Sequence, residues 1–237
     1  MTSRSALWHD LEHGSYEADL PVWRELAVRA NGAVVDLGAG TGRVAADLAA
    51  RGHDVVALDT NPDLLAVLAQ RAPSVLTVCA DARSFSLEGS FPLVIAPMQL
   101  AHIVGGHDSR VAMLQRVHAH LVAGGKFAAA LTDTGEAFVD RGDPFPLPDM
   151  LERDGWMFSS QPISLRDENG TAVLERHRQA VSPTGEIEEE MAQVALDVFS
   201  TEQFEAEARS AGLEPVERLE IPETSDHIGS TVVICQR

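Results

Sequence analysis

Apolar and polar positions follow two different patterns along the chain, and the change falls near residue 133. Up to that point, short apolar runs predict buried strands, at 33–37, 54–59, 74–80, 91–97 and 126–132. The segments between them carry apolar residues every three or four positions and predict helices, at 42–52, 61–72 and 108–125. Strands and helices that alternate at this spacing form right-handed crossovers, so we expect a mostly parallel sheet with helices on both faces.

After residue 133 the pattern changes. A Pro-rich connection at 140–150 leads into stretches of alternating polar and apolar residues, separated by the turn signals "DENG" and "SPTGE". These stretches predict three antiparallel strands, followed by a helix over 200–212 and two closing strands. We therefore expect helices in 1–31, an α/β domain built from 32–133 and 199–237, and an antiparallel β insertion at 134–198.

Composition and charge narrow the classes of partner. The 237 residues hold 18 Lys and Arg against 36 Asp and Glu, a net charge of -18 that repels phosphate backbones and argues against a nucleic-acid partner. No apolar run approaches the roughly 20 residues of a membrane span, and the first 20 residues lack the apolar centre of a signal peptide. We expect a cytoplasmic protein, monomeric or homodimeric, without a membrane partner.

The two cysteines, Cys79 and Cys235, both lie in apolar runs, and no Cys/His cluster with metal-ligand spacing accompanies them. We expect two buried, reduced thiols and no metal site.

A glycine-rich turn follows the first predicted strand. In "DLGAGTG", Gly38, Gly40 and Gly42 have a G-x-G-x-G spacing rather than the G-x-G-x-x-G of dinucleotide folds. Glycine permits positive φ and leaves no Cβ where a ligand approaches the backbone. Asp36, two residues earlier, would repel a pyrophosphate but attract a sulfonium or ammonium group. This charge and the spacing argue against a nicotinamide dehydrogenase.

Acidic residues also end the next two predicted strands. Asp59, followed by Thr60, is placed to accept hydrogen bonds from both hydroxyls of a ribose. Asp81 is placed for the exocyclic amine of adenine, and the N–H of Ala82 for a ring nitrogen. Together with Asp36, these strand ends describe a site for an adenosine that carries a positively charged tail.

On these residues the sequence resembles the class I S-adenosylmethionine-dependent methyltransferases. "VVDLGAGTG" is similar to their motif I, "VVALDTN" to their ribose-binding strand end, "CADARSF" to their adenine loop and "FPLVIAPMQLAHI" to their motif IV, over about residues 30 to 133. The resemblance implies a Rossmann-like α/β fold with a mostly parallel seven-stranded sheet, S-adenosylmethionine as cofactor and S-adenosylhomocysteine as product. It also implies that Gly38, Ala39 and Gly40 line the methionine portion, and that Met98 packs near the ligand.

The sequence departs from part of the family after the fourth strand. Relatives that methylate adenine or glutamine amides carry Asn/Asp-Pro-Pro-Tyr there, whereas this chain has "APMQL". The difference favours nitrogen or oxygen methylation of a small molecule. A protein or RNA methyltransferase, and a non-catalytic protein that binds S-adenosylmethionine, remain as alternatives.

Two residues are candidates for catalytic roles. His102 follows the fourth strand and would serve as general base for a hydroxyl acceptor, unless it is a structural histidine. By family inference, Tyr16 belongs to an N-terminal helical lid, with its ring near the transferring methyl group. Arg43 would either meet the cofactor carboxylate or lie on the helix surface.

The remaining histidines and several aromatic residues are predicted either near an acceptor pocket or in a structural or surface position. His9, His13, His107, His177 and His227 could border an acceptor pocket beneath the insertion, whereas His53, His118 and His120 are expected in solvent. Phe138, Phe145, Trp156 and Phe158 would form either an apolar wall of that pocket or a satellite core.

Overall fold

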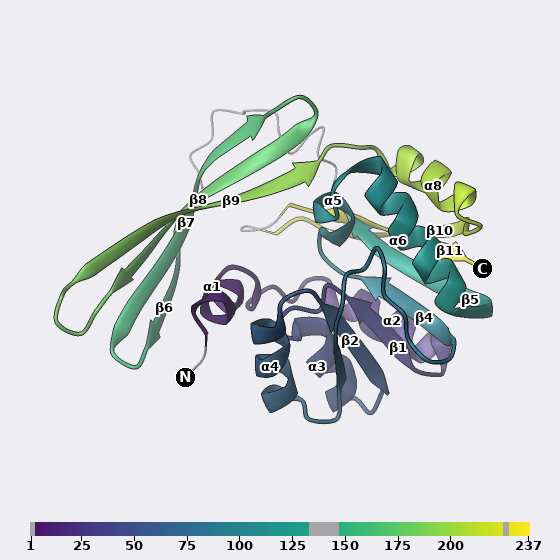
Figure 1. Ribbon diagram of the computed structural model, residues 1–237, viewed down its shortest axis with the longest axis horizontal. Coiled ribbons are helices and arrows are strands. Elements are labelled where there is room, and N and C mark those ends of the chain that lie inside the picture. The colour runs from purple at the N-terminus through teal and green to yellow at the C-terminus, as the bar shows by residue number, and fades with distance from the viewer. Residues whose placement is uncertain (1–2, 133–146, 225–227) are drawn as a thin grey trace.

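A seven-stranded mixed sheet forms the body of the molecule (Figure 1). The structure is a computed structural model that describes residues 3–132, 147–224 and 228–237. The strand order is β10-β11-β5-β4-β1-β2-β3. The strands are β1 (Val34–Leu37), β2 (Val55–Asp59), β3 (Leu76–Cys79), β4 (Phe91–Ala96), β5 (Leu121–Leu131), β10 (Glu214–Ile221) and β11 (Ser230–Gln236). Strands β3, β2, β1, β4 and β5 are parallel, and β11 runs antiparallel to β5 and β10, which confirms the predicted fold class.

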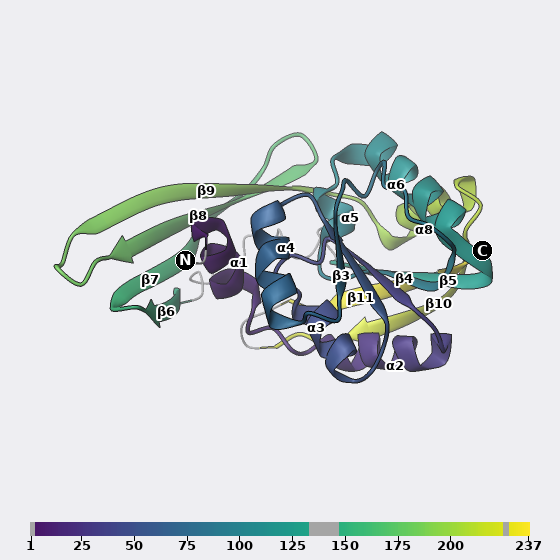
Figure 2. The same ribbon diagram turned by 60° about the horizontal axis from the view of Figure 1, so that its bottom comes forward.

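Helices cover both faces of this sheet, as Figure 2 shows. One face packs against α2 (Leu20–Ala30), α3 (Arg43–Ala50) and α4 (Pro62–Arg71). The other packs against α5 (Leu100–Ile103), α6 (Gly106–His120) and α8 (Thr201–Ser210). Each face has its own buried cluster, so the central strands β1 and β4 are covered on both sides.

The helix ends follow the sequence signals closely. The side chain of Asn61 accepts the N–H of Asp63 at the start of α4, and Ser200 forms a capping box with Gln203 at the start of α8. Helix α6 ends at His120 rather than at the glycine pair, because Leu121 already has extended backbone and begins β5.

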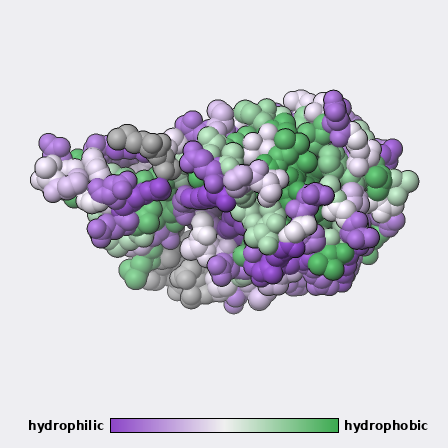
Figure 3. Space-filling view, turned by 90° about the horizontal axis from the view of Figure 1, so that it is seen from below, coloured by the Kyte–Doolittle hydropathy of each residue, from purple (hydrophilic) through white to green (hydrophobic). Residues whose placement is uncertain are grey.

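The described part of the insertion, residues 147–198, contains four antiparallel strands, so the prediction of three was wrong. They are β6 (Asp149–Arg153), β7 (Trp156–Asp167), β8 (Thr171–Val181) and β9 (Ile187–Asp197), in that order across the sheet. Strand β6 was missed because it is a short edge strand without clear alternation, directly after the Pro-rich connection. This sheet projects from the body, and many of its surface residues are hydrophilic (Figure 3).

Helix α1 (Arg4–His13) lies between the body and the insertion sheet, in contact with α4, β6 and β7 (Figure 1). Leu7, Trp8 and Leu11 pack against Phe158 and Ala180, with Trp156 at the edge of the cluster. Trp156 and Phe158 therefore belong to a satellite core under α1, which was one of the two predicted roles; Phe138 and Phe145 lie outside the described residues.

The two cysteines differ in exposure. Cys235 is buried, but Cys79 is exposed because β3 is the outermost strand of the sheet, so the prediction of two buried thiols was wrong.

No helix among residues 3–132, 147–224 and 228–237 is long and apolar enough to cross a membrane.

Candidate active site

The glycine-rich turn joins β1 to α3 at the carboxyl edge of the parallel strands. Gly38, Gly40 and Gly42 have φ values of 68°, 56° and 92°, in the left-handed region that side chains with a Cβ rarely adopt. A Cβ on Gly38 would lie 2.9 Å from a methyl carbon of Leu100, and one on Gly42 would lie 2.1 Å from a methyl carbon of Leu68. The turn is therefore a close-packed cradle that only glycines can form.

Asp59 ties this cradle to the end of β2. Its carboxylate accepts the N–H of Gly40 at 2.9 Å and the N–H of Asn61 at 2.8 Å. The carboxylate keeps lone pairs beyond these two bonds, because an ionised carboxylate accepts about four hydrogen bonds. Its position beside the cradle fits the predicted contact with ribose hydroxyls; Thr60, next in the chain, is exposed.

Asp36 lies on β1 between Ala57 of β2 and Ile95 of β4. It is 1% exposed, and neither carboxylate oxygen has a hydrogen-bond partner among the described residues. Burial raises the pKa of Asp36 to about 8, although the nearby Arg43 guanidinium and the backbone N–H of Ala45 at the start of α3 oppose the shift. An unpaired buried carboxyl group of this kind is unfavourable for stability and marks a candidate functional site.

Arg43 was predicted to meet the cofactor carboxylate or to lie on the helix surface. It instead forms a two-point ion pair with the buried Asp19, at 2.5 and 2.7 Å, and donates to the carbonyl of Tyr16 at 2.8 Å. Its guanidinium lies 5.2 Å from the centre of the Tyr16 ring. Arg43 thus fastens the segment between α1 and α2 to the cradle, and Tyr16 is buried beside it.

The residues expected near the adenine and the methyl group lie at the same sheet edge. Asp81 follows β3 and binds the guanidinium of Arg83, which holds the pKa of Asp81 below its ordinary value. Ala82 is buried. Met98, just after β4, has a φ of 55°, a strained conformation for a residue with a Cβ and one that often marks a functional site.

Helix α1 covers the cradle through contacts that the sequence did not reveal. Thr41 of the glycine turn donates a hydrogen bond to Asp10 at 2.6 Å, and Arg71 of α4 pairs with the same carboxylate. On the other side of α1, the buried Glu12 binds Arg178 and Ser160 of the insertion sheet. These contacts link cradle, lid helix and insertion sheet, but join residues too far apart in sequence for spacing to indicate them.

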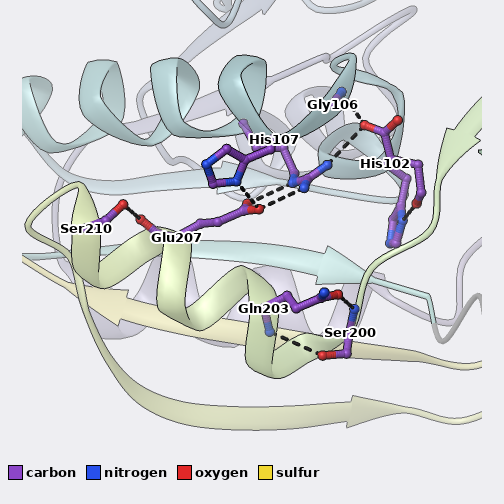
Figure 4. Close-up of polar contacts among 9 residues, drawn as sticks. His102, Gly106, His107, Ser200, Gln203, Glu207 and Ser210 are labelled. Carbon is purple, nitrogen blue, oxygen red and sulfur yellow. Dashed lines mark hydrogen bonds and ion pairs between the residues drawn. The ribbon is translucent and has the colours of Figure 1, made fainter. Parts of the chain in front are cut away.

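The structure argues against His102 as a general base. Its ring is buried, and Nδ1 donates to the carbonyl of Asp197 at 2.8 Å (Figure 4). The Nε2 atom accepts the N–H of Thr132 at 3.2 Å. Burial also lowers the pKa of His102 below its ordinary value. Both nitrogens are thus occupied by backbone groups, and His102 has a structural role, stacked on Phe199 with ring centres 4.3 Å apart.

The other histidines divide between surface and core. His107 binds Glu207 at 2.8 Å, and His177 lies 3.5 Å from Glu189 on the insertion sheet. His120, expected in solvent, is buried: its Nε2 accepts the N–H of Leu87, and its ring stacks on Phe85, so that expectation was wrong. His227 lies outside the described residues.

The comparisons with known proteins agree with this geometry. Residues 34–125, which contain the cradle, Asp59 and the loop after β3, match a methyltransferase-domain family model. The chain carries a class I S-adenosylmethionine-dependent methyltransferase domain. The predictions of this family and of S-adenosylmethionine as its cofactor are thereby confirmed for the domain.

Among curated proteins, the methyltransferase domain is similar to Rv3342 of Mycobacterium tuberculosis, described as an uncharacterized methyltransferase, with 33% identity over 96 residues. That match spans 38% of this chain and 40% of the relative.

Two solved structures resemble the chain over nearly its whole length. CalS10, an amino pentose methyltransferase from Micromonospora echinaspora, has a TM-score of 0.78 at 20% identity and covers 100% of this chain and 98% of its own. The sugar N-methyltransferase KedS8 from Streptoalloteichus sp ATCC 53650 has a TM-score of 0.82 at 19% identity and covers 100% and 94%. At these identities the likeness concerns the fold, including the helix and insertion outside the methyltransferase domain.

Replacing Asp59 by alanine is expected to weaken S-adenosylmethionine binding by about 1–3 kcal/mol, because hydrogen bonds between the ribose and a charged group are lost. Isothermal titration calorimetry measures this change. Asp63→Ala, in the exposed first turn of α4, is the matched control and should leave the affinity unchanged. Equal affinities of Asp59→Ala and the wild type would contradict the assignment of Asp59 to the ribose.

Proposed function

We propose that this protein is a methyltransferase that transfers the methyl group of S-adenosylmethionine to a nitrogen of a small molecule. The observation that carries the proposal is Asp36, an unpaired and buried carboxyl group beside a cradle of three left-handed glycines. A sulfonium cofactor with an ammonium group supplies the positive charge that this position lacks. A pyrophosphate cofactor would place negative charge there.

The residues around the cradle fit the cofactor. Gly38, Ala39 and Gly40 would hold the methionine portion, Asp59 the ribose, and Asp81 with Ala82 the adenine. Both oxygens of Asp81 already accept hydrogen bonds from Arg83, so the adenine amine would have to replace part of that pairing. When bound, S-adenosylmethionine supplies an electrophilic methyl group, and the chain supplies position and the exclusion of water.

A small acceptor is favoured by what covers the site. Helix α1 lies over the cradle and is itself covered by the insertion sheet. The similar structures with the same overall fold include an amino pentose methyltransferase and a sugar N-methyltransferase, which favours nitrogen over oxygen in this proposal. The proposed parts are a lid in residues 1–31, a cofactor domain in 32–133 and 199–237, and an acceptor-side insertion in 134–198. The cytoplasmic location and the oligomeric state remain predictions.

The test is calorimetric titration with S-adenosylmethionine, S-adenosylhomocysteine and NADH in parallel. Micromolar binding of the two adenosyl ligands alone, followed by mass-spectrometric detection of methylated products from a panel of amino sugars and small amines, would support the proposal. Binding of NADH alone would overturn it. Binding of the adenosyl ligands without product from any nitrogen or oxygen acceptor would favour a non-catalytic binding protein.

The affinity for S-adenosylmethionine should rise with pH up to about pH 8. Free Asp36 has a pKa of about 8, and a bound cation lowers it, so binding releases a proton below that pH. The affinity should therefore fall by up to about tenfold per unit as the pH drops from 8 toward 6. Titrations at pH 6, 7, 8 and 9 measure the slope. Asp36→Asn should abolish the part of the slope that is due to this group, and an unaltered slope in that variant would contradict the assignment.

A further inference from the structure

Two histidines lie one turn apart on α1, the helix that covers the cradle. The ring centres of His9 and His13 are 5.1 Å apart, with the ring planes inclined at 71°. Both belong to the stretch of α1 that holds Asp10 and Glu12, between the glycine turn and the insertion sheet (Figure 1). The cofactor contacts derived above use neither histidine.

The ring of His9 lies directly against the cradle. A Cβ on Gly40 would be 2.3 Å from His9 Nε2, so this nitrogen occupies the space above the glycine backbone. The N–H of the same glycine is held by Asp59, the proposed ribose ligand. A cofactor bound across Gly38, Ala39 and Gly40 would therefore meet the Nε2 edge of His9.

The hydrogen bonds around His9 assign its tautomer. The hydroxyl of Thr41 has a single proton, which it donates to Asp10 at 2.6 Å. Burial alone would raise the pKa of Asp10, but hydrogen bonds from Arg71 and Thr41 hold it below its ordinary value, so Asp10 is ionised and can only accept. His9 Nδ1, 3.3 Å from the Thr41 oxygen, must then be the donor of that contact. The Nε2 atom consequently carries the lone pair of the neutral ring.

The surroundings keep His9 uncharged. Burial lowers its pKa, although Asp10 and Glu12 on the same helix and Asp59 at the end of β2 act in the opposite direction. Arg43 of α3 lowers it further. The neighbouring His13 is also uncharged, because burial and then His9 lower its pKa to about 4.

We infer that His9 contacts the sulfonium end of the cofactor through its Nε2 lone pair, and that the site thereby binds S-adenosylmethionine more tightly than S-adenosylhomocysteine. This inference rests on the proposed function. The two molecules share the adenine, the ribose and the amino-acid end, and differ in the methyl group and in the positive charge on sulfur. A lone pair directed at that charge stabilises the substrate form only, and release of the product becomes easier once the charge is gone.

The experiment compares affinities for the two cofactors by calorimetry in the wild type, His9→Phe and His53→Phe. Phenylalanine keeps a planar ring but removes the lone pair, and His53 lies in the loop before β2, at the opposite end of that strand from Asp59. We expect His9→Phe to lose at least about fivefold in the ratio of S-adenosylmethionine to S-adenosylhomocysteine affinity. His53→Phe should keep the wild-type ratio. An unchanged ratio in a folded His9→Phe, or equal losses for both ligands, would overturn the inference.

A second measurement uses the unaltered protein. In NMR spectra of histidine-labelled wild type, the His9 ring signals should differ between the complexes with S-adenosylmethionine and S-adenosylhomocysteine, while those of His53 coincide. Identical His9 signals in the two complexes would overturn the inference while leaving the proposed function intact. Failure of the wild type to bind either ligand would overturn the proposed function itself.

Discussion

Replacing Asp36 by asparagine is expected to weaken S-adenosylmethionine binding by about 100-fold and, at the same time, to stabilise the cofactor-free protein. The loss of affinity follows from removing the buried carboxylate that would pair with the cofactor's positive charge, an effect of about 2–5 kcal/mol. Asparagine has nearly the same shape, so the cradle backbone should persist. Calorimetry measures the affinity, and chemical denaturation measures the free energy of unfolding.

The gain in stability follows from the raised pKa. An aspartate with a pKa of 3.8 in the unfolded chain and about 8 in the folded protein must take up a proton to stay folded at pH 7, which costs about 4 kcal/mol. A buried asparagine amide without partners costs about 1–3 kcal/mol, so the variant should be about 1–3 kcal/mol more stable at pH 7. Because the folded-state pKa of Asp36 is raised, wild-type stability falls as the pH rises from about 4 to about 8.

Asp36→Asn should accordingly be less stable than the wild type near pH 4, and its advantage should appear and grow as the pH rises toward 8. Leu37→Ala, at the next residue of β1, is the contrasting variant, because it should lower stability through a core cavity. Unchanged cofactor affinity in Asp36→Asn, or a loss of stability at pH 7, would contradict the view that Asp36 is kept unpaired for a ligand.

The sequence predicted the glycine turn and the acidic strand ends at one edge of the sheet because these signals are local. Parallel strands end at a common edge, so Asp36, Asp59 and Asp81, each at or near a strand end, had to lie close together. Gly38, Gly40 and Gly42 marked a turn that needs left-handed backbone, and all three have positive φ. Helix caps such as Asn61 and Ser200 are local for the same reason.

The features that the sequence could not indicate depend on contacts between residues that are far apart along the chain. Arg43 pairs with Asp19, 24 residues away, and His102 is held by Asp197, 95 residues away. The sequence around His102 suggested a catalytic histidine, and the sequence around His120 suggested a surface histidine. Both are in fact buried structural residues. Cys79 has an apolar neighbourhood in sequence but lies on an edge strand.

The largest effect on stability is expected from Arg110→Ala. The Arg110 side chain is 6% exposed; it binds Glu207 through two bonds of 2.8 Å and Asp197 at 3.0 Å, and lies 4.1 Å from the centre of the Phe199 ring. Figure 4 shows Glu207 of this cluster close to His107, with Gly106 at the start of α6. Removing the guanidinium leaves two carboxylates without their cation, which costs about 3–5 kcal/mol.

The pKa of Glu207 gives this effect its pH dependence. Burial alone would raise the pKa of Glu207, but Arg110 and His107 overcome it and hold the value below the ordinary one. A lowered folded-state pKa contributes stability above the unfolded-state value, and that contribution is lost as the pH falls through the folded-state pKa. Arg110→Ala should therefore be more damaging at neutral pH than in acid, where the ion-pair contribution declines while the lost packing on Phe199 remains. Chemical denaturation at pH 7 and pH 4 tests both statements.

Matched variants distinguish the effect of losing the Arg110 ion pairs from a general effect on helix α8. Arg218→Ala removes a guanidinium that also binds carboxylates of α8, but at a surface site with 41% exposure, and should change stability by less than about 1 kcal/mol. The double variant Arg110→Met with Glu207→Met should recover most of the loss, because no unpaired charge remains at Glu207. A single variant within about 1 kcal/mol of wild type, or a double variant no better than the single one, would contradict this account.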